Sequence, residues 1–219
     1  MKRNIITLLF LATGILSTQL VHAQSVLKEA TITYSVKIEG DMQGMPPGMA
    51  DNMSMVMSFK GNKFRSDMNM GMAQFSNISD KDKKEGLILV NLMGMKNASR
   101  LSEEQEETYA EKKHGDYTIE LSDETKDILG YTCKKTTIKS KEGDVIIYYT
   151  DKIKPSNMGP EYSIPEIKGF PLLIVTSSVG LNISIEATKL DKKADADFST
   201  AIPEGYNEMD YAKLENIMR

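Results

Sequence analysis

The sequence has 219 residues, with 27 Lys and Arg side chains against 31 Asp and Glu, and it carries a single cysteine, Cys133. This mild acidity, without a basic stretch interleaved with aromatic residues, argues against nucleic acid as a partner. One cysteine excludes an internal disulfide, so burial of apolar side chains must hold the fold together.

Residues 1–23 have the pattern of a secretory signal peptide. Lys2 and Arg3 precede an apolar stretch over 5–16, and the small Ala23 precedes the expected cleavage site. The stretch is short for a permanent anchor, since spanning a membrane takes about 20 apolar residues. We therefore expect export, to the periplasm or out of the cell.

Removal of 23 residues from 219 leaves 196, enough for one domain with a sizeable core. No later apolar run approaches the length of a membrane span, so we expect no integral membrane segment after cleavage. The expected organisation is a signal peptide over 1–23 and a single β-rich domain over 24–219.

Most of this domain alternates apolar and polar residues with a period of two and breaks at Gly, Asn, Asp or Pro, which is the pattern of strands. Short links favour an antiparallel arrangement. The predicted strands are Val26–Ile38, Met53–Phe59, Phe64–Met70, Gly86–Leu92, Tyr117–Leu121, Tyr131–Ile138, Val145–Tyr149, Leu172–Ser177 and Leu181–Leu190.

Two segments are predicted as short helices. The first runs from Ser102 to Lys113, because Ser102 and Gln105 have the spacing of a capping box; its charge on almost every side suits a solvated lid or link. The second is the tail from Asn207 to Met218, where Tyr211 and Leu214 would lie on one apolar face against the sheet.

Nine of the fifteen methionines lie between Met42 and Met72. Alternation places Met53, Met55 and Met57 on one face of their strand, and Met68, Met70 and Met72 on one face of the next. A two-residue turn at Gly61-Asn62 would pair Met55 with Met68, and only that register brings both sets to the same face.

This face has two interpretations. Methionine is flexible and polarizable, so the face could be core or the lining of a site for a lipid or other amphipathic small molecule. The residues expected on it are Met53, Met55, Met57, Phe59, Phe64, Met68, Met70 and Met72. Converging thioethers also suit Cu(I) or Ag(I), and the alternative metal site comprises Met42, Met45, Met49, Met53 and Met55.

Nothing in the sequence makes an active site. Cys133 opens a strand and is expected to be a small buried hydrophobe beside Tyr131. His114 has no second histidine in the mature chain, so zinc sites and histidine-based triads lack parts. We expect a binding protein and not an enzyme, with no cofactor; a structural or protein-interaction module of the cell envelope is the remaining alternative.

Four short motifs resemble an uncharacterised family of secreted domains of unknown function that is related to the GLPGLI group. They are Ile128-Leu129-Gly130-Tyr131-Thr132-Cys133-Lys134-Lys135, Tyr149-Thr150-Asp151, Gly169-Phe170-Pro171-Leu172 and Ile202-Pro203-Glu204-Gly205-Tyr206. That family is similar in fold to LolA-type half-barrels, which carry the acyl chains of lipoproteins. The resemblance implies a single curved antiparallel sheet whose concave apolar face is partly covered by helix or loop.

Overall fold

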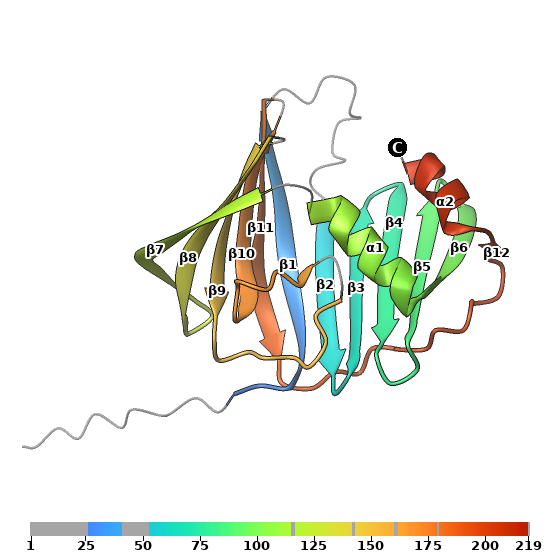
Figure 1. Ribbon diagram of the computed structural model, residues 1–219, viewed down its shortest axis with the longest axis horizontal. Coiled ribbons are helices and arrows are strands. Elements are labelled where there is room, and N and C mark those ends of the chain that lie inside the picture. Colours follow the sequence, from blue (N-terminus) through green and yellow to red (C-terminus); the bar gives the residue numbers. More distant parts are fainter. Residues whose placement is uncertain are drawn as a thin grey trace, which may run out of the picture.

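The computed structural model describes residues 26–40, 53–114, 117–141, 143–159, 162–178 and 180–218. One sheet dominates the fold, in the order β12-β6-β5-β4-β3-β2-β1-β11-β10-β9-β8-β7 (Figure 1). Its strands are β1 (Glu29–Gly40), β2 (Met53–Lys60), β3 (Lys63–Met70), β4 (Ala73–Asp80), β5 (Glu85–Leu92), β6 (Met95–Ser102), β7 (Tyr117–Ile128), β8 (Tyr131–Ser140), β9 (Gly143–Thr150), β10 (Phe170–Ser178), β11 (Leu181–Asp191) and β12 (Asn207–Glu208).

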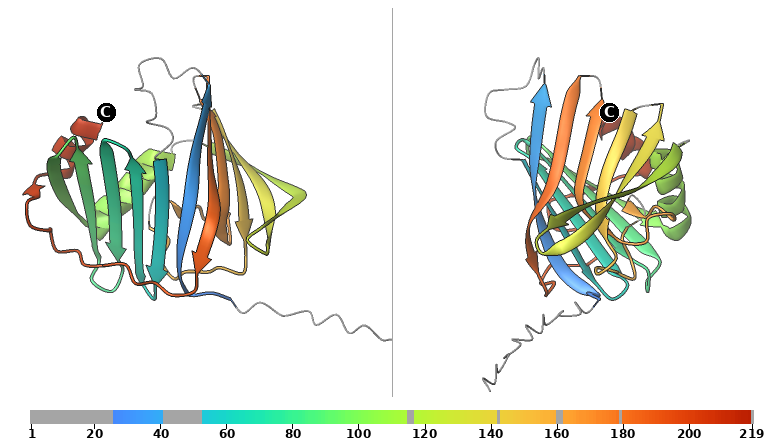
Figure 2. Two further views of the ribbon diagram at one scale, coloured as in Figure 1. Left: turned by 180° about the vertical axis from the view of Figure 1, so that it is seen from behind. Right: turned by 90° about the vertical axis from the view of Figure 1, so that its left-hand side faces the viewer.

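The predicted fold class is confirmed. The sheet is open and curved, and every pairing between its named strands is antiparallel except that of β12, which adds two residues parallel to β6. Figure 2 shows the curvature from the side, with one concave face and one convex face. The helices are α1 (Glu103–His114) and α2 (Tyr211–Met218).

The chain contains strands that the sequence pattern did not predict. β4 and β6 lie between predicted strands, and β7 continues to Ile128 where the prediction stopped at Leu121. The predicted helix over 207–218 is also shorter, because residues 207 and 208 join the sheet as β12. These segments are largely polar, so pairing with their neighbours, and not their own alternation, makes them strands.

The β2–β3 hairpin has the predicted register. Met53 pairs with Met70, Met55 with Met68, and Phe59 with Phe64, around a turn at Gly61 and Asn62. Opposite residues of an antiparallel pair share a face, so these side chains lie together. We call this face of the sheet the inner face; it is the concave one.

Two helices and one long connection lie over the inner face (Figures 1 and 2). The capping box is present at the start of α1: the Ser102 amide donates to Gln105 Oε1, and the Gln105 amide donates to Ser102 Oγ. On α2, Leu214 is fully buried against Ile88 and Leu101, as the spacing predicted. The connection between β9 and β10, whose described residues are 151–159 and 162–169, crosses in front of β1 and β2; we call these residues the segment 151–169.

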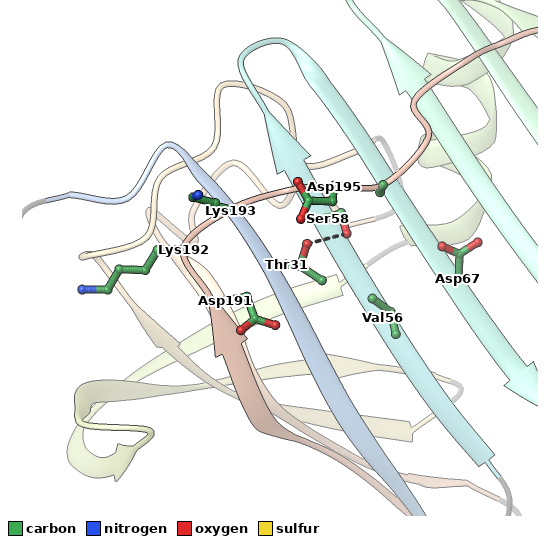
Figure 3. A pocket seen from close by; sticks show the side chains of 9 residues that line it. Thr31, Val56, Ser58, Asp67, Asp191, Lys192, Lys193 and Asp195 are labelled. Carbon is green, nitrogen blue, oxygen red and sulfur yellow. Dashed lines mark hydrogen bonds between the residues drawn. The ribbon is translucent and has the colours of Figure 1, made fainter.

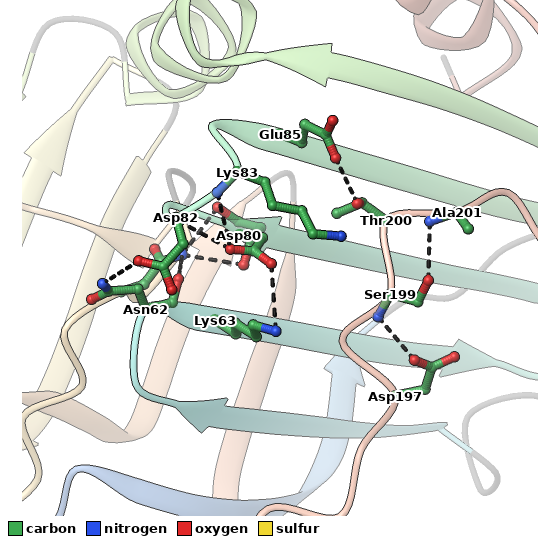
Figure 4. Close-up of polar contacts among 12 residues, drawn as sticks. Asn62, Lys63, Asp80, Asp82, Lys83, Glu85, Asp197, Ser199, Thr200 and Ala201 are labelled. Atoms are coloured by element: carbon green, nitrogen blue, oxygen red, sulfur yellow. Dashed lines mark hydrogen bonds and ion pairs between the residues drawn. The ribbon is translucent and has the colours of Figure 1, made fainter.

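The convex outer face is covered by the segment that follows β11, residues 192–206, which crosses the strands in Figure 2. Arg65 holds this segment by donating to the carbonyl of Asp197 (2.8 Å), and Thr200 does so by donating to Glu85 (2.8 Å; Figure 4). Ile202 and Tyr206 then pack on a small outer cluster of Ile78, Leu87, Leu89 and Ala98. This segment therefore covers part of the outer face.

Within the described ranges, no helix has the length and apolar character needed to cross a membrane. The signal peptide predicted over 1–23 lies outside those ranges and stays a prediction.

Candidate functional site

The inner face has a filled half, which is the main core. Met55, Met57, Phe59 and Phe64 are fully buried there with Tyr34, and the covering segment 151–169 supplies Ile153. The ring of Phe59 lies 5.2 Å from that of Phe170, and the ring of Phe64 lies 5.7 Å from that of Tyr162. This half of the methionine face therefore packs against the chain itself.

A glycine lets the covering segment come this close. Gly159 has φ +71°, and a β carbon there would lie 2.7 Å from the Phe64 ring. Asn157 fixes the same stretch: its amide donates to the carbonyl of Asn62 (3.1 Å) and to Ser79 Oγ (3.1 Å), and its oxygen accepts from the Gly159 amide (2.9 Å). These bonds satisfy a buried polar side chain and lock the segment onto the hairpin.

The other half of the inner face forms an apolar strip that is only partly buried. Val36 lies opposite Ile185, and Ile38 lies opposite Ile183, on the same face as Tyr34 and Met55. The strip, defined as Val36, Ile38, Met68, Met70, Ile183 and Ile185, has intermediate exposure throughout. It continues from the filled half on the same face: Val36, Met68 and Ile185 pack against the main core, and Met68 lies opposite the buried Met55.

The structure sorts the eight predicted ligand-face residues into three groups. Met53, Met55, Met57, Phe59 and Phe64 are buried, while Met68 and Met70 belong to the apolar strip. Met72 does not share the face, because the strand ends at Met70 and Met72 lies in the following turn with 52% of its surface exposed. Seven of the eight predicted residues thus share one face. The prediction that Met72 joins them was wrong.

Sequence reasoning missed the β1 and β11 members of the strip. The signal was present, since Ile32, Tyr34, Val36 and Ile38 alternate without a break, as do Leu181, Ile183 and Ile185. The pairing of β1 with β11 could not be predicted from these patterns, because the two strands are distant along the chain.

Two ionisable side chains, Cys133 and Tyr34, are buried in the core. Cys133 is fully buried beside Tyr131, as predicted, and burial raises the pKa of its thiol to about 11. The Tyr34 hydroxyl donates to the carbonyl of Pro171 (2.8 Å), and burial raises its pKa well above the ordinary value. At neutral pH the buried Cys133 thiol is therefore almost entirely protonated.

One pocket of about 660 Å³ lies on the outer face, between the sheet and the start of the segment 192–206 (Figure 3). Thr31 and Ser58 line its floor and share a hydrogen bond of 3.2 Å. Two of its carboxylates already have cations, because Asp67 binds Arg65 (2.7 Å) and Asp191 binds Lys189 (2.8 Å). Its lining is polar and of mixed charge, unlike the apolar strip.

The alternative metal site is only partly described. Met42, Met45 and Met49 lie outside the described ranges, and Met53 and Met55 are buried on the inner face. Across the ranges given above, no three His, Cys, Asp or Glu side chains gather as a metal-binding group would. The loop methionines remain a prediction.

α1 meets the sheet through a carboxylate. Glu106 lies against Gly86 of β5, where a β carbon would overlap its carboxyl group. Burial raises the pKa of Glu106 above its ordinary value of 4.5 and Glu103 adds to the increase, whereas a hydrogen bond with Ser79 and the charge of Lys81 oppose it. An ion pair between Lys84 and Glu103 (2.9 Å) fastens the same end of the helix.

A curved antiparallel sheet with an apolar concave face, partly covered by helix and connection, defines a half-barrel. The chain belongs to the family described as Domain of unknown function (DUF4412), whose model matches residues 38–159, which is 122 of 219 residues. The match contains the β2–β3 hairpin, α1 and β8, the strand that carries Cys133. A search of curated proteins finds no match.

Among solved structures, PNGF-II is similar in two crystal forms, with 18% and 16% sequence identity and TM-scores of 0.56 and 0.53. The match to the first covers 87% of this chain and 33% of PNGF-II, so the chain spans about a third of that protein's length. The likeness shows that the same fold occurs within a longer protein.

Two more distant structures have the same TM-score of 0.37. The Mycobacterium tuberculosis lipoprotein LppX is 10% identical over 78% of this chain and 90% of its own. A β-barrel-like DUF1849 protein from Brucella abortus is 9% identical over 77% of this chain and 99% of its own.

Proposed function

We propose that this protein is an exported, non-enzymatic binding protein that holds an apolar or amphipathic ligand on the apolar strip of the inner face. The observation that carries the proposal is the division of this face. One half is closed by the segment 151–169, and the other half keeps Val36, Ile38, Ile183 and Ile185 partly exposed on adjacent strands.

The strip is apolar surface that the fold leaves partly in contact with water. Burial of apolar surface contributes roughly 25 cal/mol per Å², so an acyl chain laid along the strip would gain free energy that the folded chain alone does not. Flexible Met68 and Met70 at its border can adjust to guests of different shape. The resemblance of the four sequence motifs to the secreted family related to the GLPGLI group, and that family's likeness in fold to LolA-type half-barrels, belong to the same proposal.

Binding without catalysis is supported by the state of the core groups. The Cys133 thiol and the Tyr34 phenol both have raised pKa values in the buried core, and the Tyr34 hydroxyl is already bonded to Pro171. Export to the periplasm or beyond rests on the signal pattern of residues 1–23 and is part of the proposal.

A matched pair of substitutions tests the site. Ile183→Glu places a charge in the strip, whereas Ser184→Glu adds the same charge at the next residue, on the opposite face of β11. With the neutral fluorophore N-phenyl-1-naphthylamine as probe, we expect the first variant to weaken binding at least about tenfold, or 1.4 kcal/mol, and the second to leave it unchanged. Circular dichroism controls for folding. Equal affinity in both variants would contradict the site.

A further inference from the structure

One edge of the sheet carries a group of exposed apolar side chains. It is the edge where β3 turns into β4 and β5 turns into β6, at the top of Figure 1. Met72 is 52% exposed there, Met93 71% and Met95 61%. The helix α2 ends at the same edge in Figures 1 and 2, and Ile217 in its last turn is also exposed. We call these four residues the apolar edge. The other exposed large apolar side chains in the described ranges are Val26, Leu121 and Leu129.

The two turns at this edge contain no charged residue. They are Gly71-Met72 and Met93-Gly94, and the Met93 amide donates to the carbonyl of Met72 (2.9 Å), so the turns lie side by side. The turn at the other end of β4 and β5 is Lys81-Asp82-Lys83-Lys84, in which every residue is charged. These strands therefore end in charged side chains at the bottom of Figure 1 and in apolar side chains at the top.

Turn chemistry does not explain methionine at position 93. Met93 has φ +50°, a left-handed conformation that a two-residue hairpin turn normally gives to Asn or Gly. The turn is already held by Asn91, whose side-chain oxygen accepts from the Gly94 amide (3.0 Å). Most of the Met93 side chain is in contact with water, so packing within the chain does not require it either. Exposed apolar groups that gather at one place mark a surface that binds a protein or a membrane.

The apolar edge is continuous with the apolar strip of the inner face. Met70 of the strip is the last residue of β3, so the strip reaches the same end of the sheet. Met68 of the strip lies opposite Phe75 on the inner face, and Leu92 lies opposite Met95 on that face. Phe75 and Leu92 are partly buried and belong to one cluster, whereas Met95 is exposed. Apolar surface therefore extends from the strip to the edge.

We propose that the apolar edge contacts the surface of a lipid bilayer, where the strip takes up or releases its ligand. The exchange rests on the proposed function: a molecule with an acyl chain avoids free water, so its source is a lipid surface and the strip has to open toward one. A bilayer is a broad partner, so the methionines need not converge on one point. Side chains at such a surface enter the boundary between headgroups and acyl chains. Because both turns are uncharged, the contact needs no anionic lipid and resists salt.

A tryptophan reporter tests where the protein meets the bilayer, because the chain has no tryptophan of its own. Met93→Trp places an indole at the apolar edge. Its matched control is Leu129→Trp, because Leu129 also has a left-handed backbone (φ +51°), precedes a glycine and lies in a strand-connecting turn, between β7 and β8. With vesicles of phosphatidylcholine brominated on the acyl chains, we expect quenching of the Met93→Trp protein at low and at high salt, and none of the Leu129→Trp protein.

Two triple variants of the parent chain test whether apolar character at the edge is what binds. One changes Met72, Met93 and Met95 to Gln, which keeps the length of the side chain but makes it polar; the other changes them to Leu, which stays apolar. In flotation with phosphatidylcholine vesicles, we expect the Gln variant to lose at least about tenfold in partitioning and the Leu variant to bind like the parent.

The membrane contact and the ligand site can fail separately. Ile183→Glu should lose N-phenyl-1-naphthylamine and still float with vesicles, and a parent that floats without binding this probe would refute the ligand site alone. Equal quenching of both tryptophan proteins, or a Gln variant that floats like the parent, would overturn the membrane contact. So would a parent that ignores vesicles but forms dimers that the Gln variant does not form, because a second copy would then be what covers the edge.

Discussion

The carboxyl group of Glu106 lies directly against Gly86, so that α1 rests on β5 where the strand has no side chain. Burial there raises the pKa of Glu106, and the charge of Glu103 raises it further. A hydrogen bond with Ser79 and the charge of Lys81 lower it. The pKa of Glu106 is therefore higher in the folded protein than in the unfolded chain, so the protonated carboxyl stabilises the fold relative to the charged one. This contribution is complete below the ordinary pKa of 4.5 and is lost as the pH rises through the folded pKa.

Glu106→Gln should therefore stabilise the protein at neutral pH and flatten its pH dependence above about pH 4.5. The gain should be at most about 1 kcal/mol, or about 2–4 °C in Tm, because the carboxyl keeps some contact with solvent. Thermal unfolding followed from pH 4 to 8 checks this, with exposed Glu104→Gln as control. A Glu106→Gln variant with the pH profile of the parent would contradict the assignment.

The filled and open halves of the inner face should differ in their response to truncation. Met57 is fully buried, so Met57→Ala should cost about 2–5 kcal/mol, whereas Met70→Ala in the strip should cost less than about 1 kcal/mol. Urea unfolding measures both changes. Similar losses for both variants would mean that the strip is ordinary core.

The Cys133 thiol should be unreactive in the folded protein. Its pKa rises from 9.0 to about 11 on burial, so the fraction present as thiolate at pH 8 is small and the sulfur is out of reach of solvent. Ellman's reagent should label the protein only after unfolding in urea. Rapid labelling under native conditions at pH 8 would show that the thiol is accessible and would reopen a chemical role for it.

Tyr34→Phe should destabilise the protein, because it removes a hydrogen bond between β1 and β10. The hydroxyl donates to the carbonyl of Pro171 at 2.8 Å, and its removal leaves a buried acceptor without this bond. We expect a loss of about 1–3 kcal/mol in urea unfolding, with the fold retained. A variant as stable as the parent would show that the Pro171 carbonyl finds another donor.

The sequence predicted the hairpin because its pattern is local. Alternating methionines and the Gly61-Asn62 turn left one consistent register, and the structure has it. β4 was missed because its polar residues, among them Gln74 and Asn77, show no alternation; the strand forms because β3 and β5 offer partners on both sides.

The division of the inner face could not be predicted for a related reason. Whether Met57 or Met70 is buried depends on the segment 151–169, which follows far along the chain and packs through Ile153 and Tyr162. No local pattern in that segment indicates which strands it covers.

The proposed function requires that the apolar strip holds a ligand in the exported protein. Native mass spectrometry of the protein purified from its own compartment, with organic extraction of what it carries, tests this most directly. We predict a copurified apolar or amphipathic molecule on the parent and on Ser184→Glu, and its absence from folded Ile183→Glu. A parent protein that carries nothing and takes up no added lipid, or equal loading of both variants, would contradict the claim.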